Sequence, residues 1–298
     1  MTAATVAQSV GRSTVALVQA LRPRQWTKNL LVYAAVIFAG TSNDADRWRD
    51  ATVVFVAFCL ISSASYLFND VRDAAADRKH PLKRNRPIAR GALSPQLALG
   101  TAALLAVTGI SAAALLGLDS LQYALGFTAL QLAYTVVLKR VAIVDVLTIA
   151  ALFVVRAAVG ADAVDVHISV WLLLCTALLA TFLGLAKRRA ELVLAAQGET
   201  PGRAALRAYS LPTLDAVVLA TGAATVASYA AYAIEYAPHA RSMAITVPFV
   251  AFGVARYVYL VRRQDLGEEP ENVLLADRPL LATVALWVLI AALVVTYR

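Results

Sequence analysis

The chain has 298 residues, 60% of them hydrophobic, and its mean hydropathy of +0.68 exceeds what the core of a water-soluble domain needs. A net charge of +8 would suit a nucleic-acid-binding protein, but the basic residues stand at the ends of apolar stretches, where membrane orientation places them. The sequence therefore predicts an all-α, multi-pass protein whose partner is the lipid bilayer and not nucleic acid. We expect one domain over residues 1–298, because no linker or soluble segment divides the chain.

The N-terminal residues predict a segment that lies on the membrane surface. Residues 1–20 contain neither the continuous apolar region nor the cleavage site of a signal peptide. We expect residues 1–21 to lie at the membrane interface, with residues 13–21 forming an amphipathic helix there.

Nine stretches are long and apolar enough to be predicted as membrane-spanning helices. They are residues 27–43, 51–68, 96–118, 120–138, 141–161, 168–186, 211–234, 243–261 and 279–297. The first and the fourth carry the weakest signals, the first because of its basic flank and the fourth because of its length.

Lysine and arginine residues divide unequally between the two sides of this bundle. With the N-terminus in the cytoplasm, 21 of them lie on the cytoplasmic side and four on the other. This excess predicts an N-in, C-out topology. We expect the protein in the plasma membrane. The segments with candidate site residues would then all face the cytoplasm; they are residues 22–29, 69–90, 139–145, 187–209 and 262–278.

The first of these segments, residues 22–29, reads RPRQWTKN. Arg22, Arg24 and Lys28 can be explained as anchors that hold the first span in its orientation. Lys28 lies about one turn beyond Arg24 at the mouth of that span, so it can alternatively reach an anion held inside the bundle.

Carboxylates dominate the end of the second predicted span. Asn69, Asp70, Asp73 and Asp77 follow an apolar run, and helical spacing places the three aspartates on one face. Like charges on one face repel unless a cation neutralises them, and hard oxygen ligands suit Mg²⁺. A solvated charged loop is the alternative interpretation.

A basic cluster follows the carboxylates within ten residues and comprises Lys79, Lys83, Arg84 and Arg86. In proteins, Mg²⁺ is commonly held by one or two carboxylates together with substrate phosphate oxygens, and Arg and Lys bind phosphate. The two clusters together predict a metal–phosphate site at the membrane boundary, with Mg²⁺ as cofactor.

Further charges stand at and within the fifth predicted span. Lys139 and Arg140 precede it, and Asp145 lies at its start. Asp145 either pairs with one of these cations across the turn or is a second metal or phosphate-orienting position. Arg156 lies deep in the span, where a charge is costly, and either serves a buried structural role, such as pairing with Asp162, or binds a phosphate.

The sixth predicted span ends in KRRAEL, residues 187–192. Lys187 and Glu191 are spaced as an i, i+4 ion pair, which stabilises a helix by only about 0.2–0.5 kcal/mol. Alternatively, Lys187 and Arg188 hold phosphate oxygens and Glu191 completes a second metal or hydroxyl-binding position. Beyond this segment, Tyr209 is a candidate contact to a ring hydroxyl and Arg278 a candidate ligand before the last span.

Cysteine and histidine residues predict no metal site of their own. Cys59 and Cys175 lie inside apolar stretches, where packing is expected rather than a disulfide. His80, His167 and His239 are dispersed along the chain, which argues against histidine-based metal catalysis.

The run NDxxDxxxD at Asn69–Asp77, after an apolar helix in a chain of nine predicted spans, resembles the UbiA superfamily of intramembrane prenyltransferases. The resemblance covers nearly the whole chain and implies a UbiA-like bundle of nine helices. Members carry a second aspartate-rich motif on the cytoplasmic side of the sixth helix. Here KRRAEL occupies that place, and the departure argues against a prenyl diphosphate held by two acidic motifs.

Four stretches resemble one branch of that superfamily more closely. They read RPRQWTKNLLVYA (22–34), YLFNDVRDAAADRKHPLKRNRPIARG (66–91), KRRAEL (187–192) and GEEPENVLLADRPLL (267–281). The branch serves actinobacterial cell-wall synthesis. The resemblance implies transfer of 5-phosphoribose from phosphoribosyl pyrophosphate to a decaprenyl or other polyprenyl phosphate, with release of diphosphate and a product that feeds arabinan assembly.

With this resemblance, the residues receive expected roles. Asn69, Asp73 and Asp77 would bind the metal, and Asp73, Asp77, Lys28 and Lys187 would be catalytic. The expected substrate-binding residues are Lys28, Asp70, Lys83, Arg84, Arg86, Lys139, Arg140, Lys187, Arg188, Glu191 and Arg278.

Two rival functions follow from the same sequence. A UbiA-type aromatic prenyltransferase that uses a polyprenyl diphosphate would need a second DxxxD-type site, which residues 187–209 do not contain. A transporter would need charges spread through the membrane depth, whereas here they gather at one side. The sequence leaves the oligomeric state open, a homo-oligomer included.

Overall fold

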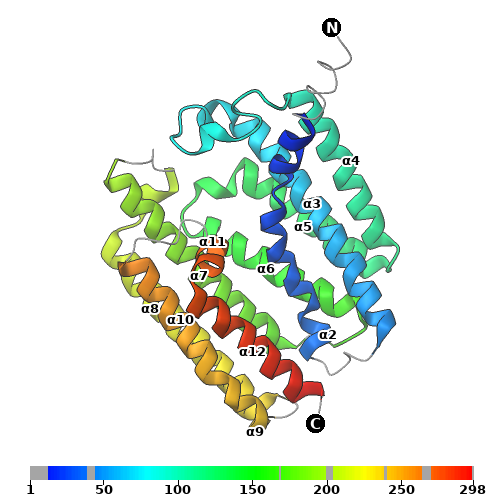
Figure 1. The fold of residues 1–298 in the computed structure, drawn as a ribbon, viewed down its shortest axis with the longest axis vertical. Coiled ribbons are helices and arrows are strands. Elements are labelled where there is room, and N and C mark those ends of the chain that lie inside the picture. The colour runs from blue at the N-terminus through cyan, green and yellow to red at the C-terminus, as the bar shows by residue number, and fades with distance from the viewer. Residues whose placement is uncertain are drawn as a thin grey trace. The chain divides into compact units, whose positions relative to one another are not determined.

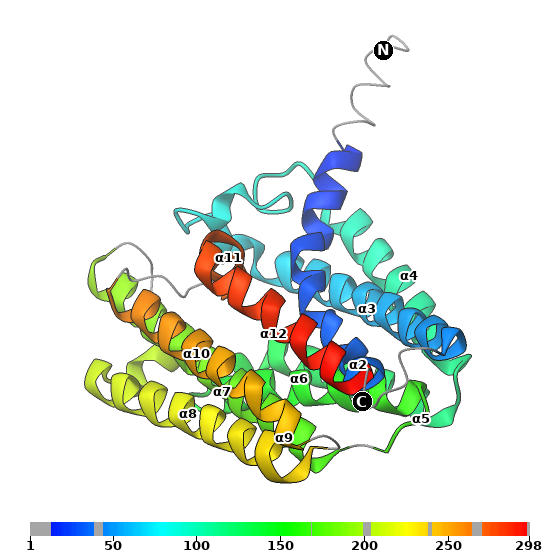
Figure 2. The same ribbon diagram turned by 60° about the horizontal axis from the view of Figure 1, so that its bottom comes forward.

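The computed structural model describes residues 13–38, 44–167, 169–198, 204–237, 240–263 and 270–296. Within these ranges every regular element is a helix, as the sequence predicts (Figures 1 and 2). The helices form two compact units. Unit 1 comprises residues 1–30 and 53–135, and unit 2 comprises residues 31–52 and 136–298. The single domain expected from the sequence stays a prediction.

Unit 1 is built around the long helix α3. Its elements are a helix at residues 13–21, the first part of η1 (Pro23–Tyr33), α3 (Ala45–Asp77) from residue 53 on, η2 (Lys83–Asn85), α4 (Pro95–Ala114) and α5 (Leu118–Val136). The helix at 13–21 buries Ala16 and Ala20, one turn apart, in a core with Leu67 of α3 and Ala98 of α4. Val15 and Val18 are exposed, so one face of this helix is packed against the unit.

The chain after α3 folds back over the end of that helix. His80 is buried, and its Nδ1 accepts hydrogen bonds from the backbone N–H groups of Leu82 and Lys83. Arg78 Nε donates to the carbonyl oxygen of Ala89 at 3.1 Å. These bonds close the connection onto itself, and this brings its basic residues back to the aspartates of α3.

Unit 2 contains the remaining helices. They are α2 (Ala34–Phe38), residues 45–52 of α3, η3 (Leu138–Arg140), α6 (Val144–Ala163), α7 (Val170–Ala196), η4 (Ala204–Ala208), α8 (Leu211–Ala231), η5 (Tyr232–Tyr236), α9 (Ala240–Met243), η6 (Ala244–Thr246), α10 (Val247–Arg263), α11 (Pro270–Ala276) and α12 (Arg278–Thr296). Helix α7 packs between α6 and α8, and α10 packs on α8 and α12 (Figures 1 and 2). Phe182, Leu260 and Val218 lie in the core between α7, α10 and α8.

Seven helices in the described ranges are long and apolar enough to cross a membrane, and each coincides with a predicted span. The two remaining predicted spans are those with the weakest signals. The first is a 3₁₀ segment, η1, followed by the short α2. The fourth is α5, a helix of 19 residues that carries Asp119, Gln122 and Gln131. The count of nine spans stays a prediction.

Both cysteines are free thiols, as predicted. The sulfur of Cys59 is buried and accepts a hydrogen bond from Asn29 Nδ2 at 3.2 Å. Cys175 Sγ lies 3.6 Å from Ser228 Oγ. Each sulfur therefore takes part in helix packing.

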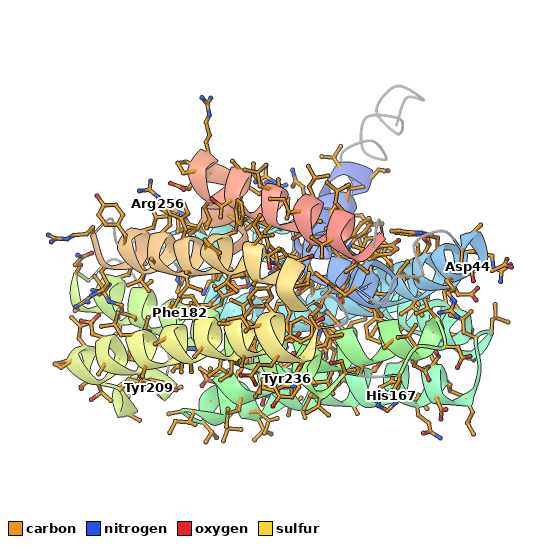
Figure 3. All side chains as sticks on the ribbon, turned by 90° about the horizontal axis from the view of Figure 1, so that it is seen from below. Asp44, His167, Phe182, Tyr209, Tyr236 and Arg256 are labelled. Carbon is orange, nitrogen blue, oxygen red and sulfur yellow. The ribbon has the colours of Figure 1, made fainter. Side chains whose placement is uncertain are left out.

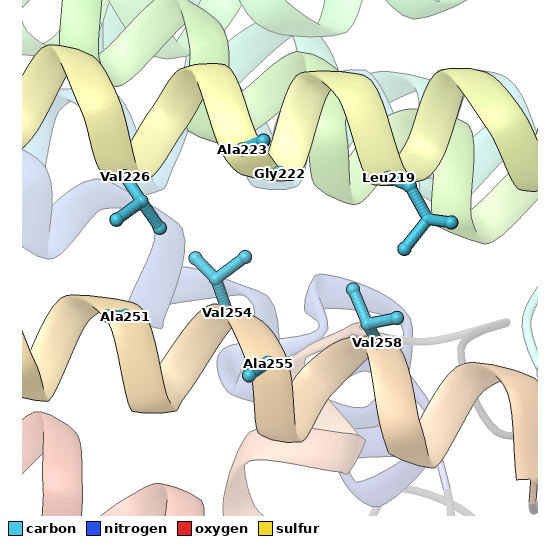
Figure 4. Close-up of a pocket in the computed structure, with 8 residues that line it drawn as sticks. All are labelled: Leu219, Gly222, Ala223, Val226, Ala251, Val254, Ala255 and Val258. Carbon is cyan, nitrogen blue, oxygen red and sulfur yellow. The ribbon is translucent and has the colours of Figure 1, made fainter.

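An apolar pocket of about 310 Å³ lies between α8 and α10. Leu219 and Val226 of α8 point toward Val254 and Val258 of α10 (Figure 4). The other lining residues are Gly222, Ala223, Ala251 and Ala255. Because no polar side chain lines it, this pocket offers no group for catalysis or metal binding.

Gly160 of α6 provides a test of the packing in unit 2. A Cβ atom there would meet the carbonyl oxygen of Val32 at less than 3.0 Å. We expect Gly160→Ala to lower the free energy of unfolding by about 1–3 kcal/mol through overpacking. The measurement is thermal unfolding of the detergent-purified protein.

Gly100→Ala in α4 is the matched control, because a Cβ atom there meets nothing within 4 Å. Alanine is the better helix former, so this variant should be as stable as the wild type or slightly more stable. Equal melting temperatures for the two variants would contradict the close approach at Gly160.

Candidate active site

The first candidate cluster lies on the last turns of α3, in unit 1. Asp70 and Asp77 are buried, with 1% and 5% of their surfaces exposed. Asn69 and Asp73 are half-buried. The predicted aspartate face is therefore withdrawn from solvent, which does not agree with the alternative of a solvated charged loop.

Two arginines neutralise this face. Arg86 Nη1 lies 3.2 Å from Asp70 Oδ1 and 2.7 Å from Asp77 Oδ2, so one guanidinium bridges two carboxylates. Arg22 Nη2 lies 2.5 Å from Asp70 Oδ1, and its guanidinium stands 5.1 Å from the centre of the Tyr66 ring. The repulsion expected between the aspartates is thus relieved by cations of the protein itself.

The oxygen atoms of this cluster fit Mg²⁺. Asp70 Oδ2 is buried and accepts no hydrogen bond from any residue that the structure describes. No three His, Cys, Asp or Glu side chains in the described ranges converge on one point. However, Mg²⁺ commonly takes only one or two carboxylates, several waters and substrate phosphate oxygens. Asp73 and Asp77, with the amide oxygen of Asn69, would hold the metal, and Asp70 would orient them. The bound metal would neutralise the charge of a diphosphate.

The basic residues predicted to bind phosphate in unit 1 have different surroundings. Arg84 is exposed and Lys83 is half-buried. Lys28 is half-buried, and its ammonium group donates a hydrogen bond to Gln25 Oε1. Arg86 is engaged with the carboxylates, so the phosphate contact predicted for it stays a prediction.

Arg22, which the sequence offers as a candidate anchor of the first span, is a member of this cluster. It ends the helix at 13–21 with a φ of +54°, in the left-handed conformation common after a helix C-terminus. The residue it contacts, Asp70, is 48 positions away. Local spacing carries no signal for such a pair.

The second candidate cluster lies in unit 2, where α6 begins and α7 ends. Arg188 is 1% exposed and Asp145 is fully buried, and Arg188 Nε lies 2.8 Å from Asp145 Oδ2. That contact is close enough for an ion pair but lacks the alignment of a hydrogen bond. Arg188 Nη1 also donates to Glu191 Oε2. One buried guanidinium therefore holds two carboxylates.

These contacts correct one pairing that the sequence offers as an alternative. Asp145 does not pair with Lys139 or Arg140 across the turn, because its ion pair is with Arg188 of another helix. Glu191 forms an ion pair with Arg188 at i, i+3, and the i, i+4 pair of Lys187 with Glu191 stays a prediction. A charge buried among helices takes the cation that tertiary packing brings nearest, which local spacing does not specify.

Tyr209 contacts the second cluster at the start of α6. Its hydroxyl accepts a hydrogen bond from the backbone N–H of Ile143 at 2.6 Å and donates to Asp145 Oδ1 at 3.4 Å. Burial raises the pKa of the Tyr209 hydroxyl, so the group keeps its proton at neutral pH. The ring-hydroxyl contact predicted for Tyr209 therefore competes with two bonds inside the protein.

Other predicted residues lie at helix ends in unit 2. Lys139 and Arg140 belong to η3, with Lys139 half-buried and Arg140 exposed. Lys187 is half-buried, and Arg278 is the exposed first residue of α12. Their phosphate-binding roles stay predictions.

Arg156 is buried within α6, as the sequence predicts. Its Nη1 donates to the carbonyl oxygen of Leu152 at 2.8 Å, and its guanidinium lies 5.2 Å from the centre of the Phe153 ring. These contacts belong to its own helix and favour the structural alternative.

A third ionic group joins helix ends and was missed from the sequence. Arg189 Nε lies 2.7 Å from Asp215 Oδ1, and its Nη1 donates to the carbonyl oxygen of Val261. Arg262 Nε lies 3.5 Å from the same Asp215 oxygen. The group satisfies a carbonyl in the last turn of α10 and ties α7, α8 and α10 together.

Comparison with known proteins identifies the family of this sequence. The sequence model of the UbiA prenyltransferase family matches residues 30–276. A protein of Mycobacterium tuberculosis (strain H37Rv) named decaprenyl-phosphate phosphoribosyltransferase is 35% identical over 288 residues, which is 95% of each chain.

The chain belongs to the UbiA prenyltransferase family. The protein of the same name from Corynebacterium glutamicum is 35% identical and covers 91% of this chain and 84% of its own length. The structure of a UbiA homolog from Archaeoglobus fulgidus bound to GPP and Mg²⁺ superposes with a TM-score of 0.74, over 94% of this chain and 99% of that one. At 17% identity, this likeness shows a shared fold.

Arg188 provides a test of the second cluster. We expect Arg188→Met to lower the free energy of unfolding by about 3–5 kcal/mol, because Asp145 and Glu191 would lose the buried cation that both contact. The triple variant that also carries Asp145→Asn and Glu191→Gln should recover most of this loss, since no buried charge is then unpaired. The measurement is thermal unfolding in detergent.

Arg140→Met is the control, because Arg140 is exposed and its loss should leave the melting temperature nearly unchanged. A triple variant as unstable as Arg188→Met would contradict the charge argument and would point to lost side-chain packing instead.

Proposed function

We propose that this chain transfers 5-phosphoribose from phosphoribosyl pyrophosphate to decaprenyl phosphate, or to a similar polyprenyl phosphate, with release of diphosphate. The observation that carries the proposal is the 35% identity, over 95% of both chains, with a decaprenyl-phosphate phosphoribosyltransferase. Similarity along the whole length favours a single transferase domain over residues 1–298.

The first cluster suits the leaving group of this reaction. Diphosphate departs from the anomeric carbon with the electron pair of the broken C–O bond and carries high negative charge. Mg²⁺, when bound, would neutralise that charge. Asp73 and Asp77 with Asn69 would position the metal, and Asp70 would orient them through its bonds to Arg22 and Arg86. Lys83 and Arg84 follow in the same connection as phosphate ligands.

The nucleophile needs little activation. A lipid phosphate is already anionic near neutral pH, so one of its oxygens can attack the anomeric carbon without a strong general base. The new C–O bond forms as the bond to diphosphate breaks. Catalysis then rests on orientation and on stabilising the departing charge. Lys28, Lys139, Arg140, Lys187 and Arg278 are the proposed cationic contacts.

The second cluster favours this reaction over transfer from a prenyl diphosphate. Arg188 stands between Asp145 and Glu191 and is already neutralised by them. A fixed guanidinium between these carboxylates leaves them poorly suited to a second metal. Among the described residues, the chain therefore offers one acidic metal site, whereas a prenyl diphosphate held by two acidic motifs would need a second.

The proposed topology follows from charge. We propose nine spans, and for these the excess of Lys and Arg favours an N-terminus in the cytoplasm, with the chain segments of both clusters on that side. Phosphoribosyl pyrophosphate is water-soluble and would enter from the cytoplasm, while the lipid phosphate would come from the plasma membrane. The product would serve as a precursor for cell-wall arabinan.

Label transfer tests this function directly. The purified protein is incubated with Mg²⁺, ribose-labelled phosphoribosyl pyrophosphate and decaprenyl phosphate, and label in the organic phase is counted. We expect transfer by the wild type and a loss of about 100-fold or more in Asp73→Asn, because the variant removes a carboxylate from the metal–diphosphate site. EDTA should abolish transfer.

Asp119→Asn, an exposed position at the start of α5, is the matched control and should transfer label normally. Equal loss in both variants would argue against the site. If the wild type instead alkylates 4-hydroxybenzoate with a prenyl diphosphate and transfers no ribose, the proposed function is wrong.

A further inference from the structure

Ile143 has a backbone conformation that β-branched residues rarely adopt. Its φ of +69° and ψ of −51° are those of a classic γ-turn, a rare and strained conformation. The Val144 N–H donates to the carbonyl oxygen of Ala142 at 2.8 Å, which is the bond that defines such a turn. The strain lies two residues before Asp145, where η3 passes into α6.

The side chain of Ile143 does not account for this turn. Ile143 is 61% exposed, so no burial of its side chain compensates for the strain. Its carbonyl accepts from the Leu147 N–H at 2.9 Å, an ordinary bond of the first helical turn. The contact from outside this segment is the hydroxyl of Tyr209, at 2.6 Å from the Ile143 nitrogen.

Tyr209 is itself held in place from both sides. Its backbone N–H donates to the carbonyl of Leu206, and its ring packs against the core of unit 2. The next residue, Ser210, caps α8 by accepting from the Thr213 N–H. Figure 3 shows Tyr209 at one end of α8 and Tyr236 at the other. A fixed hydroxyl can therefore impose a conformation on the turn that it contacts.

We propose that Tyr209 is a positioning residue, whose hydroxyl holds Ile143 in the γ-turn and so fixes the junction between η3 and Asp145. The same hydroxyl bonds Asp145, which links the turn to the buried ion pair with Arg188. Without the hydroxyl, Ile143 would relax to a negative φ, and this would change the orientation of η3 relative to α6.

The consequence for activity rests on the proposed function. Lys139 and Arg140 belong to η3, directly before the turn, and are proposed phosphate contacts. A relaxed turn moves these cations away from their phosphate while leaving the first cluster intact. Tyr209 would thereby act on substrate affinity without touching the reacting atoms.

Two substitutions separate this role from a general loss of stability. Tyr209→Phe keeps the packed ring and removes only the hydroxyl. Ile143→Gly removes the strain, because glycine adopts a positive φ without steric cost. If the hydroxyl serves to hold the turn, glycine at position 143 should compensate for its loss.

The experiment measures transfer kinetics for the wild type, Tyr209→Phe, Ile143→Gly and the double variant. We expect Tyr209→Phe to raise KM for phosphoribosyl pyrophosphate or for decaprenyl phosphate by up to about tenfold, because one hydrogen bond is lost. We expect kcat to stay within about twofold of the wild-type value. Ile143→Gly should resemble the wild type, and the double variant should return to within about twofold of it. Tyr236→Phe, an exposed tyrosine, is the control.

Hydrogen exchange of the Val144 amide tests the turn without reference to activity. We expect protection in the wild type, faster exchange in Tyr209→Phe and restored protection in the double variant. Unchanged exchange and kinetics in Tyr209→Phe would overturn the proposal, as would a loss that glycine fails to rescue. If the wild type transfers no phosphoribose, the proposed function fails, while this exchange pattern would still support the role of Tyr209 in holding the turn at Ile143.

Discussion

Buried arginine–carboxylate pairs are the interaction on which the rest of this structure depends. Arg86 bridges Asp70 and Asp77, and Arg188 holds Asp145 and Glu191. A buried or membrane-embedded carboxylate without a cation is costly, so the helices that carry these groups can pack only with their partners in place. Each of these arginines contacts two carboxylates, and in this way it holds neighbouring segments of its own unit together.

The two clusters differ in what they leave open. In the first, Asp70 Oδ2 is buried without a hydrogen-bond donor among the described residues, and Asp73 lies half-buried beside it on the same helix face. In the second, Asp145 Oδ2 also lacks a hydrogen-bond donor among the described residues, but Arg188 Nε lies 2.8 Å from it and the same guanidinium contacts Glu191. The demand for an added cation is therefore greater in the first cluster.

The sequence was sufficient to predict the helical membrane fold, the aspartate face of α3 and the cations around it, because periodicity and composition encode these features locally. It did not predict which cation meets which acid. Arg22 contacts a residue 48 positions away, and Tyr209 contacts the turn at Ile143 from a distance of 66 positions. Such contacts depend on helix packing, and the strained φ of Ile143 has no signature in composition.

In the proposed reaction, the first cluster binds phosphoribosyl pyrophosphate through Mg²⁺ and not through its arginines alone. Calorimetric titration of this substrate into the detergent-purified protein, first with EDTA and then with Mg²⁺, measures the contribution of the metal. We expect binding at least about tenfold tighter with Mg²⁺, because the arginines are already engaged with Asp70 and Asp77. Equal affinity in EDTA would show that the cations of the protein suffice, and would overturn the proposed metal site.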